Sequence, residues 1–223
     1  MIGGTISSIT LYIDGYFVNQ WDAVCMVALE EKQLPYSTAR AMLRDGAGVP
    51  LGLAERTGIA RVPSMQHGDL WLTESLAIVE YLEESFPPPD YPRLFPADPR
   101  ARAKARQLMA FVRTNLIDLR AERPWWTCVY AATDLAPLSR DAERDANELC
   151  RFAVHLSERG ELAEWNIAHA DLALTLLRLA RAGYPLPDAA QRFLDRERAR
   201  PSLRVYVDCA RPPNPPPRAL ADG

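Results

Sequence analysis

The chain has 223 residues, of which 48% are hydrophobic and 25% charged, and its formal net charge is −3. This length is enough for one large domain or for two smaller domains with their own cores. Because acidic and basic residues nearly balance, no nucleic acid is expected as a partner. No apolar run approaches the ~18 residues of a membrane span, and the N-terminus lacks the basic and apolar parts of a signal peptide. We therefore expect a cytoplasmic protein without a membrane partner.

The four cysteines are Cys25, Cys128, Cys150 and Cys209, and they form no C-x-x-C motif. The three histidines show no metal-ligand spacing with acidic residues. Free thiols and no metal site are therefore expected. The same spacing argues against a thiol-disulfide oxidoreductase that works with its own cysteines.

Strands and helices alternate in the first part of the chain. Residues 9–13 are β-branched and aromatic, which predicts a strand. Residues 21–32 carry apolar side chains at helical spacing, and residues 35–41 predict a second strand. A turn-rich, mobile connection is expected over residues 45–50, followed by a short helix over residues 51–57.

A hairpin and a helix follow in residues 61–86. Two short strands, over residues 64–67 and 70–73, flank a turn at Gly68, where glycine tolerates a positive φ. Apolar residues at helical spacing then predict a helix that begins at Glu74 and Ser75. The order strand–helix–strand and then strand–strand–helix predicts an α/β thioredoxin-like domain with a mixed four-stranded sheet.

Beyond a proline-rich stretch over residues 86–99, only helical patterns are found. Asn166 is the expected N-cap of the most apolar helix, and Asp171 is a candidate for the carboxylate of its capping box. The expected helices cover residues 100–122, 139–158, 170–182, 188–198 and 202–209. The predicted domain organisation is a first domain over residues 1–86, a linker over 87–99, an all-helical domain over 100–210 and a flexible tail over 211–223.

Two features of the hairpin segment predict a ligand site. Proline opens its first strand after Val62, and a cis bond at Pro63 would turn the backbone N–H and C=O of Val62 outward, where an extended peptide can pair with them. The N–H groups at the start of the next helix, near Glu74 and Ser75, have no intrahelical acceptor and suit a carboxylate. The alternative, in which Thr73 or Ser75 only caps the helix, agrees equally well with these residues.

With its Val-Pro step, hairpin and Glu-Ser helix start, this segment resembles the glutathione site of the glutathione transferase family. Residues 100–107, 122–124 and 165–174 resemble stretches of a bacterial group within that family, so the resemblance extends from about residue 9 to residue 209. It implies a thioredoxin-like domain followed by a helical bundle, a homodimer, and glutathione as co-substrate bound by Val62, Pro63, Glu74 and Ser75.

The resemblance also implies how the thiol is activated. In the bacterial group, a serine in an aromatic-aromatic-Ser-Pro loop is expected to hold the glutathione thiolate at the start of the first helix. Here the loop runs from Tyr16 to Gln20, and Asn19 falls on the serine position. Asn19 is therefore the predicted catalytic residue, because its amide can donate a hydrogen bond, although it is not a nucleophile.

Two functions remain open after this reasoning. The first is an enzyme that activates glutathione for attack on a small hydrophobic electrophile, a hydroperoxide or a disulfide, bound near Arg113, Trp125 and Trp126. Those aromatic residues are equally compatible with a place in the core. The second is a glutathione- or ligand-binding protein with little turnover, which Asn19 favours. The intact glutathione-binding segment favours the enzyme.

Overall fold

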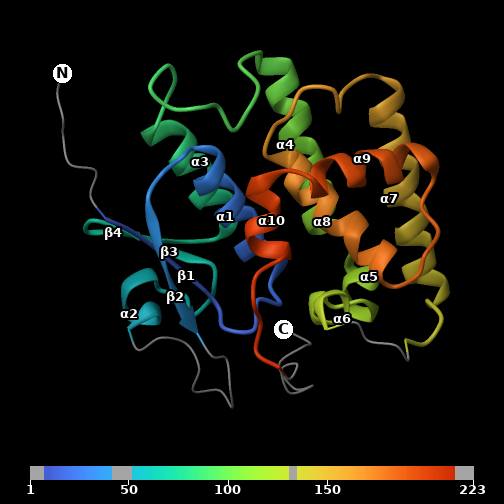
Figure 1. The fold of residues 1–223 in the computed structure, drawn as a ribbon, viewed down its shortest axis with the longest axis horizontal. Coiled ribbons are helices and arrows are strands. Elements are labelled where there is room, and N and C mark those ends of the chain that lie inside the picture. Colours follow the sequence, from blue (N-terminus) through green and yellow to red (C-terminus); the bar gives the residue numbers. More distant parts are fainter. Residues whose placement is uncertain (1–7, 42–51, 131–134, 214–223) are drawn as a thin grey trace.

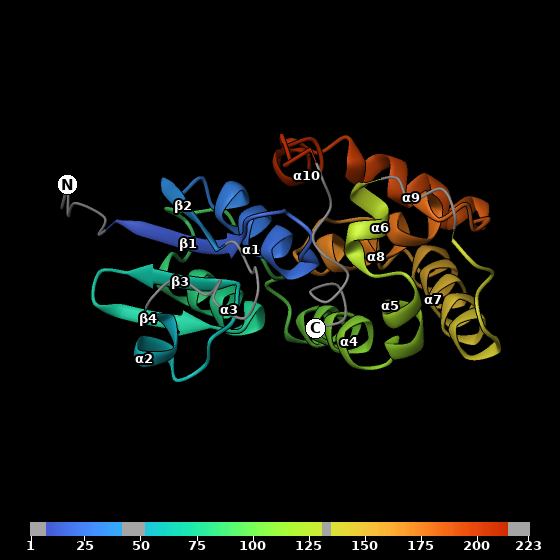
Figure 2. The same ribbon diagram turned by 90° about the horizontal axis from the view of Figure 1, so that it is seen from below.

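The computed structural model describes residues 8–41, 52–130 and 135–213. Two parts of the chain lie side by side, a sheet with its helices and a bundle of helices (Figure 2). The expected connection over residues 45–50 and the tail beyond residue 213 lie outside the described residues. Within the described ranges, no helix is both long and apolar enough to cross a membrane.

The first part is built on four strands, β1 (Ile9–Asp14), β2 (Tyr36–Ala41), β3 (Ser64–His67) and β4 (Leu70–Thr73). Their order in the sheet is β2-β1-β3-β4. β1 runs parallel to β2 and antiparallel to β3, and β4 returns antiparallel to β3. The predicted mixed, thioredoxin-like sheet is confirmed.

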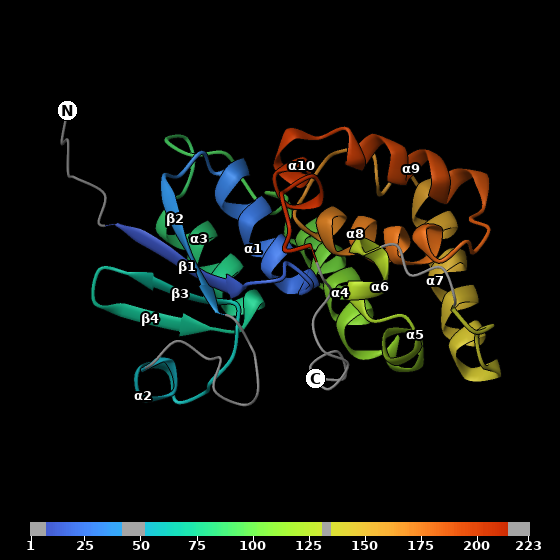
Figure 3. The ribbon, with the colours of Figure 1, turned by 60° about the horizontal axis from the view of Figure 1, so that its bottom comes forward.

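Helices cover both faces of this sheet. α1 (Gln20–Glu31) and α3 (Ser75–Ser85) contact each other and share a core with the face of β1 and β3 that carries Leu11 and Met65, both fully buried. On the other face, the ring centroid of Trp71 lies 5.3 Å from that of Tyr12. Arg56, in α2 (Leu53–Thr57), has its guanidinium 4.9 Å from the ring centroid of Trp71. α2 itself lies next to β4 (Figure 3).

The second part is helical throughout its described residues. Its central helix is α8 (Ala168–Arg181), which is buried from Ala168 to Leu179 and contacts α1 of the first domain (Figure 1). An apolar helix with no polar face belongs in the middle of a bundle, as its sequence predicted. The other helices are α4 (Pro99–Thr114), α5 (Ile117–Glu122), α6 (Trp125–Val129), α7 (Arg140–Glu158), α9 (Asp188–Arg198) and α10 (Pro201–Val207).

The prediction of one helix over residues 100–122 is wrong, because the chain breaks between α4 and α5. Neither glycine nor proline marks the break. The carboxylate of Asp145, on α7, accepts hydrogen bonds from the backbone N–H groups of Asp118 at 3.0 Å and Leu119 at 3.2 Å. It satisfies two donors that a continuous helix would have paired internally, so a distant side chain starts α5.

The predictions for the start of α8 are right only in part. The N-cap residue is Ile167, and Asn166 supplies a capping side chain from one residue earlier, since its Oδ1 accepts a hydrogen bond from the N–H of Ala168 at 3.1 Å. Asp171 does not complete a capping box. Its carboxylate is bound by Arg113 of α4 instead, which connects it to the candidate site.

Candidate functional site

The loop before α1 is folded around two buried carboxylates. Asp14 accepts hydrogen bonds from the backbone N–H groups of Tyr16 at 3.3 Å and Val18 at 2.9 Å. Asp22, in the first turn of α1, accepts one from the N–H of Asp14 at 2.7 Å. Burial raises the pKa of both carboxyl groups, and these backbone hydrogen bonds oppose the rise. Sequence reasoning missed both acids, although Asn19-x-x-Asp22 has the spacing of a capping box.

The amide oxygen and both amide hydrogens of Asn19 form hydrogen bonds within the protein. Its Oδ1 accepts a hydrogen bond from the N–H of Trp21 at 3.0 Å, which caps α1. Its Nδ2 donates to Asp22 Oδ1 at 2.9 Å and to the carbonyl oxygen of Val62 at 3.0 Å. An amide nitrogen carries two hydrogens, and both are used here. A thiolate could bind Asn19 only by displacing one of these acceptors, so its catalytic role stays a prediction.

Val62 and Pro63 lie between the start of α1 and the hairpin. The Val62-Pro63 peptide bond is cis, as expected from the sequence. The carbonyl oxygen of Pro63 accepts a hydrogen bond from Thr73 Oγ1 at 3.2 Å, which ties this step to β4. The carbonyl of Val62 therefore faces the first turn of α1 across the contact with Asn19.

Glu74 and Ser75 stand at the start of α3. Glu74 has a φ of 69°, and its side chain is exposed. Non-glycine residues rarely adopt a positive φ, and strained residues of this kind cluster at active and ligand sites. Ser75 is only 4% exposed. The structure thus places an exposed carboxylate and a buried hydroxyl on adjacent residues of one helix start.

Arg113 of α4 reaches across from the helical domain to Ser75. Its Nη1 donates to Ser75 Oγ at 2.6 Å. Its Nε and Nη2 bind the two carboxylate oxygens of Asp171 at 2.9 and 3.1 Å. The guanidinium lies 4.4 Å from the ring centroid of Trp21. Burial raises the pKa of Asp171 to about 6, and the charge of Arg113 opposes that rise. Arg113 was predicted to contact the electrophile. In the structure it contacts Ser75, a residue of the predicted glutathione site.

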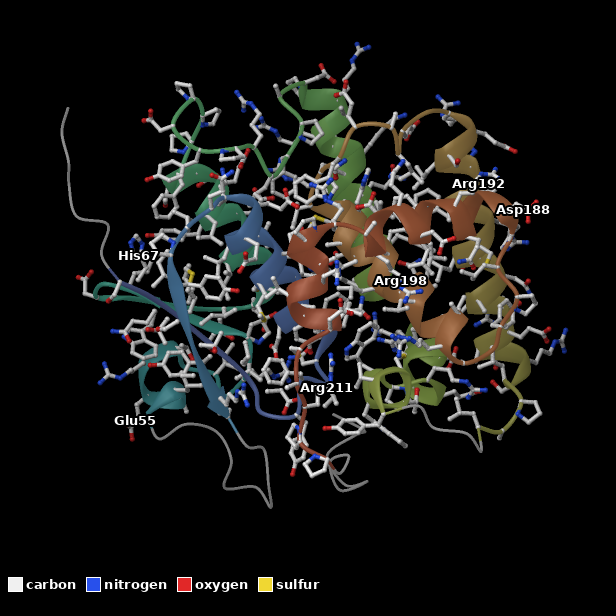
Figure 4. All side chains as sticks on the ribbon, in the orientation of Figure 1. Glu55, His67, Asp188, Arg192, Arg198 and Arg211 are labelled. Atoms are coloured by element: carbon white, nitrogen blue, oxygen red, sulfur yellow. The ribbon has the colours of Figure 1, made fainter. Side chains whose placement is uncertain are left out.

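Tyr206 of α10 joins the helical domain to the loop before α1. Its hydroxyl accepts a hydrogen bond from the N–H of Asn19 at 3.1 Å and donates to the carbonyl oxygen of Asn19 at 2.8 Å. Its ring lies 5.8 Å from that of Phe17, between centroids. The guanidinium of Arg211, on the segment that follows α10 (Figure 4), lies 5.6 Å from the ring centroid of Tyr206. Sequence reasoning missed Tyr206, because no local pattern marks it.

The two predicted electrophile-binding tryptophans differ in their environment. Trp125 is 4% exposed and belongs to the hydrophobic core, with the guanidinium of Arg178 5.9 Å from its ring centroid. Trp126 is half-buried. The geometry favours a core role for Trp125, which was one of the two alternatives, and leaves surface on Trp126.

Cys25 lies directly beneath Ser75. Its side chain is fully buried, and its Sγ is 4.0 Å from the carbonyl oxygen of Ser75. Burial raises its pKa well above the ordinary value, so it stays a thiol at neutral pH. All four cysteines are free. Across residues 8–41, 52–130 and 135–213, no group of three or more His, Cys, Asp or Glu side chains has the arrangement of a metal site.

Comparisons with known proteins agree with this geometry. The family model of the glutathione S-transferase N-terminal domain matches residues 7–84, and that of the C-terminal domain matches residues 98–209. A crystal structure of a glutathione transferase homologue from Burkholderia gl BGR1, with bound glutathione, is 31% identical. That match covers 91% of this chain and 97% of the other, with a TM-score of 0.70.

Two curated relatives match over shorter lengths. Human glutathione S-transferase theta-1 is 29% identical over 106 residues, which cover 48% of this chain and 42% of the relative. A stringent starvation protein A homologue from Histophilus somni is 30% identical over 131 residues, which cover 57% of this chain and 53% of the relative. The chain thus spans about half the length of the curated relatives it matches.

Proposed function

Because the chain belongs to the glutathione S-transferase family, we propose that it binds glutathione as a co-substrate and activates its thiol. The thiolate then attacks a small hydrophobic electrophile, a hydroperoxide or a disulfide. One observation carries this proposal. The side chain of Asn19 caps α1 and also bonds the carbonyl of Val62 at 3.0 Å, so the helix start and the peptide-pairing backbone lie within reach of one tripeptide.

Three groups bind the tripeptide in this proposal. The backbone of Val62, next to Pro63, pairs with the cysteinyl unit in the manner of an added strand. The carboxylate of the γ-glutamyl unit accepts hydrogen bonds from the hydroxyl and N–H of Ser75 at the start of α3. The exposed carboxylate of Glu74 pairs with the ammonium group of the same unit.

The thiol is activated at the start of α1. Its proton leaves to solvent, and the thiolate is stabilised by the dipole of α1 and by a backbone N–H group that lacks an intrahelical acceptor. The sulfur then forms a bond to the electrophile as the leaving group departs with its electron pair. Both amide hydrogens of Asn19 are already donated, and so are the backbone N–H groups of Asn19, Trp21 and Asp22. The N–H of Gln20 is therefore the favoured hydrogen-bond donor at this helix start. Trp126, which is half-buried, is the remaining predicted aromatic contact for the electrophile.

A second function is supported by the charges near this site. Asp14 and Asp22 are both buried in the loop and first turn where the thiolate would form. Whatever negative charge these acids carry opposes ionisation of a thiol beside them, while burial raises the pKa of both. A glutathione- or ligand-binding protein with little turnover has the same fold, and stringent starvation protein A homologues are among the relatives.

One panel of measurements separates the two functions. Glutathione binding is titrated by calorimetry, and turnover is measured with an aryl halide, an organic hydroperoxide and a mixed disulfide. Binding with turnover of any of the three supports the transferase. Binding without turnover supports the binding protein, and no binding removes both proposals.

We further propose a cytoplasmic homodimer, because closed two-fold dimers are the commonest soluble oligomers and pairing is typical of this family. Light scattering at micromolar concentration tests the oligomeric state. The mass of a single chain would contradict the dimer.

A further inference from the structure

A chain of three polar side chains connects the two domains at Ser75. Asp171 of α8 is fully buried, Arg113 of α4 is 11% exposed, and Ser75 of α3 is 4% exposed. Arg113 stands in the middle, with two bonds to Asp171 and one to the hydroxyl of Ser75. The first two residues belong to the helical domain and the third to the sheet domain.

The direction of these hydrogen bonds matters for what Ser75 can bind. A guanidinium only donates, and a serine hydroxyl has one hydrogen and two lone pairs. The bond of 2.6 Å from Arg113 Nη1 therefore occupies a lone pair of Ser75 Oγ and leaves its hydrogen to donate elsewhere. The positive charge of the donor also strengthens the hydroxyl as a donor. Such a hydroxyl suits an anionic acceptor.

Arg113 is held rigidly enough to orient that hydroxyl. Its planar fork binds both oxygens of Asp171, and its face stacks on Trp21. A lysine has no such fork and cannot reproduce the three directed bonds. The geometry therefore suits orientation of Ser75 better than direct contact with an electrophile.

We propose that Arg113 and Asp171 are positioning residues through which the helical domain orients Ser75 for the γ-glutamyl carboxylate of glutathione. This inference rests on the proposed function, since it assumes that glutathione binds at Ser75. Asp171 holds Arg113, Arg113 fixes the Ser75 hydroxyl, and the hydroxyl donates to the carboxylate. Affinity for one group of the co-substrate is thus set from the other domain.

The test compares glutathione with an analogue that lacks only this carboxylate, 4-aminobutyryl-cysteinyl-glycine. Both are titrated by calorimetry into the wild type, Ser75→Ala and Arg113→Gln. Removing a charge-assisted hydrogen bond is expected to weaken glutathione about tenfold in each variant. The analogue should bind all three proteins within about twofold. The double variant should be no weaker than either single one, because the residues act in series.

Arg106→Gln is the matched control. Arg106 also lies on α4 and forms an ion pair with Glu80 of α3 at 2.7 Å, but it does not touch Ser75. The substitution Arg106→Gln removes an ion pair between α4 and α3, the two helices that the Arg113–Ser75 hydrogen bond also joins. It should leave the affinity for glutathione unchanged. Thermal melts establish that each variant is folded. If Arg113→Gln does not fold, Arg113→Lys replaces it with the same expectation.

The outcomes separate this inference from the proposed function. If the wild type binds no glutathione, the proposed function fails and this inference fails with it. If Ser75→Ala weakens glutathione and the Arg113 variant does not, only this inference is overturned. It is also overturned if the Arg113 variant weakens glutathione and the analogue equally, since Arg113 would then act only on the fold. Selective loss of glutathione supports it.

Discussion

Replacing Asp171 by asparagine should change how the stability of this protein depends on pH. Burial raises the pKa of Asp171 from 3.8 to about 6, against the opposing charge of Arg113. A carboxyl with a raised pKa takes up a proton on folding, so its stabilising contribution is complete below pH 3.8 and is lost as the pH rises through about 6. A shift of roughly two pKa units corresponds to ~3 kcal/mol. Cys25, which also interacts with this carboxylate, stays neutral throughout this range.

Asparagine has nearly the same shape as aspartate but does not ionise. Relative to the wild type, Asp171→Asn should therefore gain ~3 kcal/mol of unfolding free energy between about pH 4 and pH 7. Any constant cost of the substitution cancels in this difference. Urea denaturation followed by tryptophan fluorescence, at half-unit steps of pH, measures it for both proteins. A difference that does not change with pH would refute the raised pKa, and a change of opposite sign would show that Arg113 outweighs burial.

Four further predictions concern the site and the cysteines. Asn19→Ala should destabilise the fold by about 1–3 kcal/mol in urea denaturation, because α1 loses its cap and buried Asp22 loses a donor; unchanged stability would contradict this account. If backbone N–H groups hold the thiolate, the same variant should keep the ultraviolet titration of bound glutathione, whereas a raised thiol pKa would return the role to Asn19. Glu74→Ala should weaken glutathione more than tenfold, since a charged hydrogen bond contributes about 1.5–3 kcal/mol, and equal affinities in calorimetry would remove Glu74 from the site. Folded protein treated with iodoacetamide at neutral pH should be alkylated at the half-buried Cys209 before the fully buried Cys25, as read by mass spectrometry; the reverse order would show that the site opens beneath Ser75.

Helices and strands that are determined by residues close in the sequence were predicted well. The strands of the hairpin follow from alternation around Gly68, and α3 follows from apolar spacing after Ser75. The break between α4 and α5 was not predicted. Its cause is the carboxylate of Asp145, which lies 27 residues from Asp118 in the chain and binds its N–H at 3.0 Å. Helical periodicity contains no information about such a partner.

The same distinction holds for the candidate site. The sequence by itself predicted Val62, Pro63, Glu74 and Ser75 as the contacts of the tripeptide, because they lie in one short segment whose turn and helix start are encoded locally; their binding role stays a prediction. Only the tertiary structure decided what surrounds them. Arg113 meets Ser75 across 38 residues, and Tyr206 meets Asn19 across 187 residues. These contacts form because packing of α4, α8 and α10 against the first domain brings distant side chains together, and burial then sets their charges and hydrogen bonds.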